Sequence, residues 1–429
     1  MKAMMCLPVG LLSACGLVLS CSSSSTPGTT SSSGGTQSTS GGAGGASSAG
    51  APSGGKSSGG SSAGGVPGVA PVNGTCSPNS VKHPDGLCYC QPDTLTSCPD
   101  GCYDPQSDPD HCGDCSTKCA ASATCNAGKC SAAPSTFVPA ATGCGSIHLV
   151  LSSGTLYWTD QTHGTVQSIA TAAGSTAKPV AMGQTSPTLI AVNGTTVYWL
   201  TGKSIMKSAA GAAPTPVATS TDDIHGFTLS DDGNTLYYAS TTIVNKTPSA
   251  GGGAVTEVGH EDTGIPHALS VSGNLIAYPA DLTGDVDIMT MVDGTPAACS
   301  SDTTTNKNCL RVARSQGSIY LDGMYLLNGN AYWGNQANIS TASTTDTSGT
   351  NDTVAGGSPD ASTLGAFSIS NNTVFLADNL GGVYQAPLMV NATAAGIARG
   401  QMGVTSIAAD TSNVYFATGD CAIMSAPLK

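Results

Sequence analysis

Short segments in which apolar and polar residues alternate follow one another from about residue 137 to the end of the chain, separated by turns rich in Gly, Asn and Asp. This alternation is typical of antiparallel strands joined by hairpins. One phrase, first seen in TLYWTD (155–160), returns in related form six times. Its anchor positions are Trp158, Trp199, Tyr238, Tyr278, Trp333, Leu376 and Phe416. Their spacings are 41, 39, 40, 55, 43 and 40 residues, and a period near 40 predicts four-stranded β-propeller blades.

Each repeat predicts the same order of strands. An inner strand such as TLIAVN (188–193) leads into the aromatic strand, which is followed by a third strand such as GTVQSIA (164–170) and an outer strand such as KPVAM (178–182). The aromatic pair is expected to pack between neighbouring blades, where large flat side chains fill wide spaces. The fold class is therefore all-β, a propeller of seven blades, with six or eight if one repeat is misread.

The last repeat stops before its outer strand, and a matching segment, STFVPAAT (135–142), precedes the first blade. We expect this N-terminal strand to close the ring, because an open propeller leaves unpaired strand edges. Cys144 and Cys421 lie in loops expected on one face, which predicts a disulfide that locks the closure. A second disulfide, Cys299–Cys309, would close a local loop and explain the 55-residue interval.

The repeats resemble extracellular propeller repeats of the YWTD type, most closely the VYWTD…GTV units of bacterial surface propellers. The resemblance covers about two-thirds of the chain, residues 131–429, and implies the propeller fold. Only the first repeat keeps the full YWTD (157–160), so the family's ligand sites cannot be transferred to this chain.

Residues 76–130 form a different region, with ten cysteines and few apolar residues between them. Such a segment cannot build a core and must be held by cross-links. Ten cysteines predict five disulfides with many hundreds of possible pairings, so none is assigned. Zinc at the CxxC pair of CGDC (112–115) is the alternative. The cysteines are Cys76, Cys88, Cys90, Cys98, Cys102, Cys112, Cys115, Cys119, Cys125 and Cys130.

The second part of this module, residues 98–130, resembles the cysteine-rich repeat of stigma-specific proteins, which also occurs in myxobacterial surface lipoproteins. The resemblance rests on the cysteine spacing and on the DPxxCGxC core, and it implies an extracellular structural role. Asp104, Asp108, Asp110 and Asp114 are candidate Ca²⁺ ligands. Aspartates beside Pro or Gly also serve as ordinary turn residues.

The sequence predicts an export signal at the N-terminus. Lys2 precedes an almost uninterrupted apolar run over residues 3–19, which is too short to span a membrane. The sequence resembles a bacterial lipoprotein signal (1–20) with Cys21 as the lipidated residue, or Cys15 as the alternative. Neither cysteine is followed by Asp, and that resemblance implies the outer membrane or cell surface. Residues 21–75 are mostly Ser, Gly, Thr, Ala and Pro, and this composition predicts a flexible tether with a reach of about 40 Å.

Composition narrows the class of partner. The formal net charge is −13 with only 14 Lys and Arg residues, which excludes the clustered basic surface that nucleic acid requires. From residue 76 onwards neither GxSxG nor HExxH occurs, and no dinucleotide fingerprint follows a strand. Membrane contact is expected through the lipid anchor alone.

Candidate chemistry gathers at the first residues of the inner strands, which are expected to line the central channel. Read repeat by repeat, these positions are His148, Thr188, His225, His267, Asp322, Leu364 and Ser406. Three histidines and an aspartate suit Zn²⁺ or another transition metal, which can activate water when one coordination position is open. Nearby carboxylates in HED (260–262) and at Asp222 and Asp223 form a second polar group in same-face loops.

The sequence thus favours a non-enzymatic, surface-anchored lipoprotein that binds an extracellular protein, peptide or glycan through the propeller loop face and channel mouth. The alternative is a metal-dependent lyase or hydrolase with His148, His225, His267 and Asp322 at its centre. No cofactor is certain, and Zn²⁺ and Ca²⁺ are the candidates.

Overall fold

The computed structural model describes Gly68, Pro71 and residues 75–428, apart from positions 78, 93, 144, 210, 263, 282–284, 295, 296, 300–307, 317, 318, 347 and 359. The predicted signal peptide, Cys15, Cys21 and almost all of the tether lie outside the described residues. Within the described part of the chain, no helix is long and apolar enough to cross a membrane.

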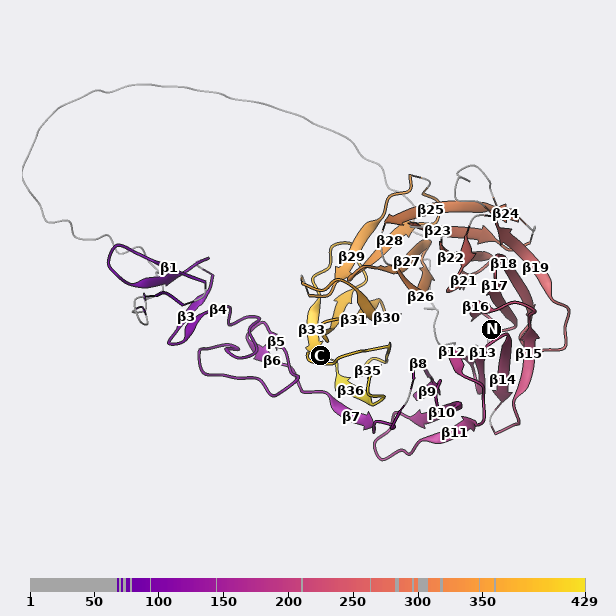
Figure 1. Cartoon of the computed structure of the whole chain (residues 1–429), viewed down its shortest axis with the longest axis horizontal. Helices are drawn as coiled ribbons and strands as arrows, with labels where there is room; N and C mark the ends of the chain where they lie inside the picture. The colour runs from indigo at the N-terminus through magenta and orange to yellow at the C-terminus, as the bar shows by residue number, and fades with distance from the viewer. Residues whose placement is uncertain are drawn as a thin grey trace, which may run out of the picture.

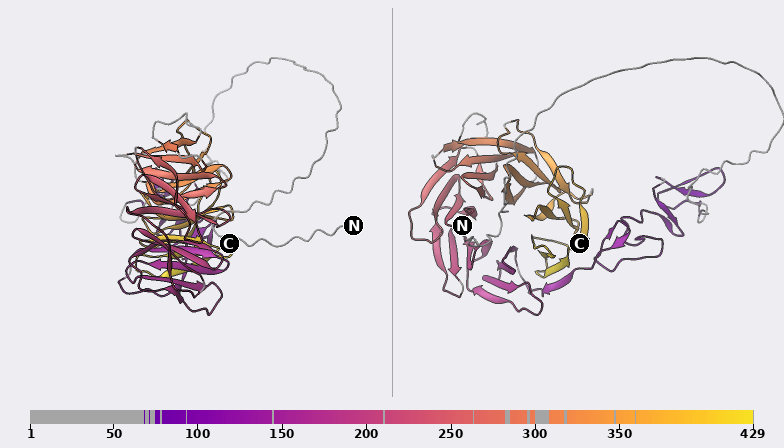
Figure 2. Two further views of the ribbon diagram at one scale, coloured as in Figure 1. Left: turned by 90° about the vertical axis from the view of Figure 1, so that its right-hand side faces the viewer. Right: turned by 180° about the vertical axis from the view of Figure 1, so that it is seen from behind.

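Seven sheets are arranged radially around one axis, and each sheet is one blade (Figure 1). Seen from the side, the ring is a short, thick disc (Figure 2). In most blades the chain runs from the inner to the outer strand before it passes to the next blade; the outermost strands of blades three and seven come from elsewhere in the chain. The prediction of a seven-bladed propeller is therefore confirmed.

The first two blades have four strands each. Blade one contains β8 (Ile147–Ser152), β9 (Thr155–Asp160), β10 (Thr165–Ala170) and β11 (Lys178–Ala181). Blade two contains β12 (Pro187–Asn193), β13 (Thr196–Thr201), β14 (Ser204–Ala209) and β15 (Thr215–Thr219).

Blades three and four have five strands each. Blade three contains β16 (Ile224–Leu229), β17 (Thr235–Ser240), β18 (Ile243–Pro248), β19 (Thr256–Glu261) and β24 (Ala297–Cys299). Blade four has a divided inner strand, β20 (Ile265–Pro266) and β21 (Ser270–Ser272), followed by β22 (Leu275–Asp281), β23 (Asp285–Val292) and β25 (Cys309–Gln316).

The remaining blades return to four strands. Blade five contains β26 (Ile319–Leu327), β27 (Asn330–Asn335), β28 (Asn338–Ser343) and β29 (Asp352–Gly356). Blade six contains β30 (Leu364–Ser370), β31 (Thr373–Asp378), β32 (Val383–Pro387) and β33 (Ala395–Ala398). Blade seven contains β34 (Ser406–Ala409), β35 (Asn413–Ala417), β36 (Ile423–Pro427) and the N-terminal β7 (Ser135–Val138).

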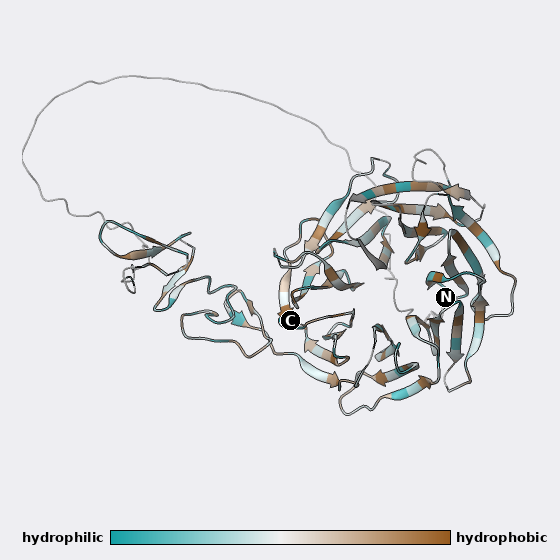
Figure 3. Ribbon diagram, in the orientation of Figure 1, coloured by the Kyte–Doolittle hydropathy of each residue, from teal (hydrophilic) through white to brown (hydrophobic). Residues whose placement is uncertain are grey.

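The two members of each aromatic pair pack against different neighbours, because successive residues of a strand point to opposite faces of the sheet. In β13, Tyr198 shares a buried cluster with Tyr238 of the next blade. Trp199, the following residue, packs with Val166 and Ala181 of the previous blade. Seven hydrophobic clusters repeat this arrangement, one at each blade interface. Figure 3 shows hydrophobic and hydrophilic positions interspersed along the same strands.

Strand β7 closes the ring. It pairs antiparallel with β36, placing Ser135 opposite Ser425 and Val138 opposite Ile423. The predicted closure by an N-terminal outer strand is confirmed. Cys421, two residues before β36, is disulfide-bonded, whereas Cys144 lies outside the described residues.

The long fourth repeat does more than close a local loop. Cys299 and Cys309 form the disulfide that the sequence predicted. However, Cys299 lies in β24, which pairs in parallel with β19 of blade three, while Cys309 begins the outer strand of blade four. The extra residues therefore connect two neighbouring blades.

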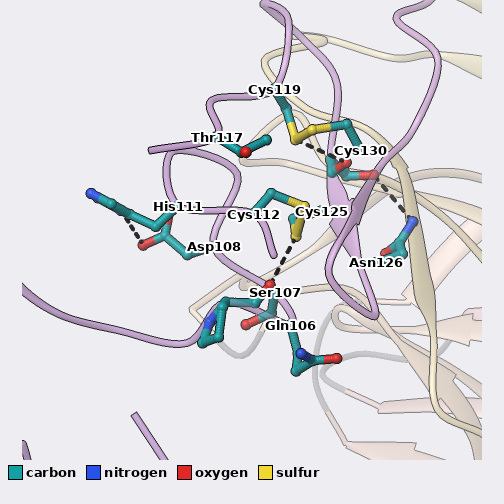
Figure 4. Close-up of a disulfide and its surroundings, with 12 residues drawn as sticks. Gln106, Ser107, Asp108, His111, Cys112, Thr117, Cys119, Cys125, Asn126 and Cys130 are labelled. Atoms are coloured by element: carbon teal, nitrogen blue, oxygen red, sulfur yellow. Dashed lines mark hydrogen bonds and ion pairs between the residues drawn. A yellow bond between two sulfur atoms is a disulfide. The ribbon is translucent and has the colours of Figure 1, made fainter. Parts of the chain in front are cut away.

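The cysteine-rich module consists of three short hairpins. They are formed by β1 (Ser80–Lys82) with β2 (Cys88–Cys90), β3 (Thr96–Cys98) with β4 (Gly101–Tyr103), and β5 (Cys125–Asn126) with β6 (Lys129–Cys130). Its five disulfides are Cys76–Cys88, Cys90–Cys102, Cys98–Cys115, Cys112–Cys125 and Cys119–Cys130. The last two lie beside each other (Figure 4).

These pairings exclude the zinc alternative at CGDC, since both of its cysteines are oxidised to disulfides with other partners. Three of the candidate Ca²⁺ aspartates, Asp104, Asp110 and Asp114, form hydrogen bonds or ion pairs with nearby residues of the module. Asp104 accepts a hydrogen bond from Ser107 Oγ at 2.6 Å, and Asp114 accepts one from the Ser116 N–H at 2.7 Å. Asp110 forms an ion pair with Lys118. These carboxylates cap turns and pair with cations, as aspartates in turns commonly do.

The module rests on the outer edge of blade six. Thr124 Oγ1 donates to the Gly396 carbonyl of β33 at 2.7 Å, and the Arg399 N–H donates to the Ser122 carbonyl at 3.0 Å. The Arg399 Nε also donates to the carbonyl of Ala123 at 2.8 Å. A Cβ at position 396 would lie 2.9 Å from the Thr124 methyl group, so glycine permits this close approach. The module thereby covers an otherwise open strand edge.

Candidate functional site

A cavity of about 250 Å³ lies on the propeller axis. The inner strands of all seven blades contribute to its wall, in keeping with their arrangement around the axis in Figure 1. Most of the lining is apolar, including Leu189, Ile190, Phe227, Met324 and Phe367. A concave, mainly apolar space with a few polar groups is the usual form of a small-ligand site.

Three aromatic side chains shape one part of the wall. Tyr325 and Phe367 meet edge to face, with ring centroids 5.3 Å apart. Phe227 lines the cavity from blade three. Gly323 leaves room for the Phe367 ring, since a Cβ at that position would lie 2.4 Å from it. The arrangement is fixed by packing between adjacent inner strands.

Two of the lining hydroxyls are used to join blades. Ser406 Oγ accepts a hydrogen bond from the Leu149 N–H at 2.9 Å, and Ser270 Oγ accepts one from the Leu326 N–H at 2.9 Å. Each bond connects the inner strands of neighbouring blades. Polar recognition in the cavity therefore depends on other groups, chiefly His148, Thr228 and Asp231.

Asp231 lies at the end of the cavity opposite His148 along the inner strands. Its Oδ2 accepts a hydrogen bond from the Gly273 N–H at 2.8 Å, and its side chain is solvent-exposed. Its carboxylate and the aromatic walls together suit a ligand that has an apolar body and a hydrogen-bond donor at one end.

The positions predicted to line the channel all lie on or beside the inner strands. His148, Thr188, His225 and Asp322 lie in β8, β12, β16 and β26. Leu364 and Ser406 begin β30 and β34, and His267 lies between β20 and β21. The structure describes the backbone of Asp322 but not its side chain.

The three histidines do not form one cluster. His225 and His267 are adjacent, with ring centroids 5.4 Å apart and the rings edge to face. His148 lines the axial cavity, and its Nε2 lies 3.5 Å from Ser146 Oγ. Among the side chains that the structure describes, the only group of three or more His, Cys, Asp or Glu residues close enough to share an ion is Cys112, Cys119 and Cys130. All three are in disulfides, and a catalytic Zn²⁺ normally has three protein ligands.

Most side chains of the second polar group, His260–Asp262 with Asp222 and Asp223, contact neighbouring protein groups. His260 contacts Glu257 through Nδ1 at 3.0 Å and Asp262 through Nε2 at 3.5 Å. Glu261 is buried and accepts a hydrogen bond from the hydroxyl of Tyr278 at 3.1 Å. Burial, together with the Glu261 carboxylate, raises the pKa of Tyr278 well above its ordinary value. Asp222 and Asp223 remain exposed in the preceding same-face loop.

One local pairing escaped the sequence reasoning. Asp160, the last residue of the YWTD phrase, is buried and accepts hydrogen bonds from the His163 N–H at 3.0 Å and from His163 Nδ1 at 2.7 Å. Asp378, at the same position of the sixth repeat, accepts from the Leu380 and Gly382 N–H groups. The signal was available, because both aspartates follow the anchor residue by two positions. They cap the turn between the second and third strands.

No protein-family model matches this chain, and no curated protein matches it. Among solved structures, a catalytically inactive virginiamycin B lyase from Staphylococcus aureus, solved with quinupristin, overlaps with a TM-score of 0.52 at 10% identity. The overlap covers 69% of this chain and 100% of the lyase. The selenomethionine-substituted lyase gives 0.51 at 10% identity, with 69% and 99% covered. The nidogen/laminin complex overlaps at 0.37 and 12% identity over 52% of this chain and 86% of that chain, too little for a comparison of sites. These likenesses concern the fold alone.

Proposed function

We propose that the protein is a non-enzymatic binding protein whose ligand enters the central channel from the loop face. The observation that supports this function is the axial cavity, to which every blade contributes and whose lining residues are mostly apolar and include Phe227, Tyr325 and Phe367. A closed ring fixes that wall from all sides, so a ligand would meet a site formed before it binds.

The ligand is a group with an apolar body of limited size, such as a peptide side chain or a small amphipathic molecule. A volume of about 250 Å³ is at or below the lower end of drug-sized pockets. The exposed carboxylate of Asp231, with Thr228 on the same strand, would orient a polar end of the ligand, and His148 would contact its opposite end.

The binding unit would act outside the cell. In this proposal Cys21, or alternatively Cys15, carries a lipid at the outer membrane or cell surface, and the Ser/Gly-rich tether holds the module and propeller clear of it. The partner is then an extracellular protein, peptide or glycan. The net charge of −13 argues against nucleic acid.

The test is a thermal-shift screen of the full chain with short peptides and small amphipathic molecules, repeated on Thr228→Trp and Thr219→Trp. Thr228 lines the cavity, so a tryptophan there fills it, whereas Thr219 is exposed on the outer strand of blade two. Because a ligand at 100 times its Kd stabilises the native state by about 2.7 kcal/mol, a true hit raises the Tm of the unsubstituted protein and of Thr219→Trp but not that of Thr228→Trp. An equal rise in all three proteins would show that the channel is not the site.

The second candidate function is a metal-dependent lyase or hydrolase, which the adjacent rings of His225 and His267 favour. Its test is metal content by mass spectrometry, comparing the purified chain with a His148→Ala/His225→Ala/His267→Ala variant. About one equivalent of Zn²⁺, lost in the variant, would favour the enzyme. Equal background metal in both proteins would end this candidate.

A further inference from the structure

A second cavity lies away from the channel, between blades five and six. Its volume is about 250 Å³. We call it the blade five–six pocket, and the lining residues that matter for its chemistry are Asn330, Tyr332, Asp346, Asn351, Asp352 and Met389. None of these residues contributes to the axial cavity, so the two spaces can be tested independently.

The floor of the pocket is a polar row across blade five. Strand register places Tyr332 of β27 opposite Thr341 of β28, and Thr341 opposite Asp352 of β29. Asn330 lies opposite Ser343 one step along the same strands. Residues opposite one another on one sheet face are within side-chain contact distance. The row therefore offers a phenol, hydroxyls, an amide and a carboxylate on a rigid sheet.

The opposite rim is apolar, and its backbone is held firmly. Met389 and Val390 have exposed fractions of 60% and 44%. They belong to a loop tied to blade five, because the Asn391 N–H donates to the Thr353 carbonyl and the Ala392 N–H donates to the Val354 carbonyl, both at 2.8 Å. Two neighbouring exposed apolar side chains beside a polar cavity, on a fixed loop, form an amphipathic surface before any ligand arrives.

The lining selects against anionic ligands. Among the residues that the structure describes around this pocket, none is Lys, Arg or His, so the charged side chains that an anionic group would meet are Asp346 and Asp352. Asp346 Oδ1 already accepts the Ser348 N–H at 2.8 Å, and that bond lowers the pKa of its carboxyl group.

We propose that the blade five–six pocket binds a neutral saccharide. A sugar ring has hydroxyl groups along its edge and an apolar C–H face. Its hydroxyls would be paired by the carboxylates and amides, which offer multiple acceptors and donors in fixed geometry. The apolar face would rest on Met389 and Val390. The small volume suits one sugar ring at the end of a chain.

The experiment is saturation-transfer NMR on the full chain with glucose, galactose, mannose, N-acetylglucosamine, N-acetylgalactosamine, fucose and rhamnose. The pocket variants are Asp352→Ala and Met389→Lys. Their matched controls are Asp222→Ala, an exposed aspartate elsewhere, and Met182→Lys, whose parent side chain is 69% exposed in blade one. We expect transfer to at least one sugar, with affinity about tenfold weaker in each pocket variant and unchanged in both controls. Retained native melting curves establish that the variants fold.

The proposal is overturned if none of the seven sugars receives saturation, or if the affinity is unchanged in both pocket variants. A signal that disappears on adding EDTA would also overturn it, because recognition would then require a metal ion. Thr228→Trp blocks the channel but leaves this pocket intact, so failure here is distinguishable from failure of the channel function.

Discussion

The module and the propeller solve the same problem of stability in opposite ways. The described module has five disulfides that join cysteines 11 to 17 residues apart. Its one buried cluster is centred on Cys112, Cys119, Ala123 and Cys125. The propeller instead has a hydrophobic cluster at every blade interface. A short segment cannot bury enough apolar surface to offset its chain entropy, whereas a ring of about 290 residues can.

Because of this difference, core substitutions should destabilise the propeller and cysteine substitutions should destabilise the module. The largest loss of unfolding free energy is expected at a blade interface. Trp333→Ala removes a fully buried indole between blades four and five, which should cost about 3–5 kcal/mol of unfolding free energy. The loss should appear in denaturant unfolding of the propeller.

The matched change is Trp333→Phe. Among the described residues the buried Nε1–H of Trp333 has no hydrogen-bond acceptor, whereas Trp199 Nε1 donates to Gln184 Oε1 at 3.1 Å. Trp333→Phe should therefore be milder than Trp199→Phe, which leaves Gln184 without its partner. Equal losses at the two sites, or a larger loss for Trp333→Phe, would show that the hydrogen bond of Trp199 does not decide the order.

The next effect is confined to the module. Replacing Cys98 and Cys115 together by Ser removes the cross-link over 17 residues, which should cost about 3 kcal/mol of module stability. Limited proteolysis should cut residues 76–130 faster while the propeller melting transition stays in place. A shifted propeller transition would mean that the two parts unfold as one unit.

A smaller effect is expected where the two parts meet. Arg399→Ala removes the Nε hydrogen bond to the Ala123 carbonyl and the contact of Nη2 with Asp110 at 3.6 Å. The docking should weaken by about 1–2 kcal/mol, without loss of either fold. Hydrogen exchange should then speed up at β33 and at residues 122–126. Unchanged protection at these amides would place the docking energy elsewhere.

The smallest effect concerns acid pH. Hydrogen bonds from the N–H and hydroxyl of Ser116 and from Thr117 lower the pKa of Asp114 from 3.8 to about 2. Because the folded pKa lies below the unfolded one, the stabilisation is complete above about pH 4 and is lost as the pH falls towards 2. Asp114→Asn should remove this acid dependence from module unfolding and leave the propeller unchanged. A variant that keeps the full acid dependence would assign it to another carboxylate.

Much of the propeller was predictable because its information is local and periodic. The recurring aromatic or bulky apolar anchor indicates the second strand of every blade, and the early end of the last repeat indicates the closing strand β7. The disulfide pairing of the module was not predictable, since cysteine spacing alone permits too many arrangements. Nor was the passage of β24 to blade three, because parallel pairing with β19 depends on how two blades sit side by side.

The candidate site was only half predictable for a similar reason. Counting along the inner strands places His148, His225 and His267 near the axis, but it cannot tell which of them meet. Adjacent blades bring His225 and His267 together, and His148 lies elsewhere along the ring. The docking of Thr124 on Gly396 joins residues 272 positions apart, and no local pattern carries such information.

The position of β7 has a mechanical consequence. The strand that completes blade seven follows the module directly, with four residues between Cys130 and Ser135. Along the covalent chain, tension applied from the N-terminal side would be transmitted to the propeller through this strand. The contacts of the module with β33 would take part of the pull first and would shield the β7–β36 pairing from peeling. The β7–β36 pairing that closes the ring would thus also bear force applied to the N-terminal side, and the docked module would reduce the share that it bears.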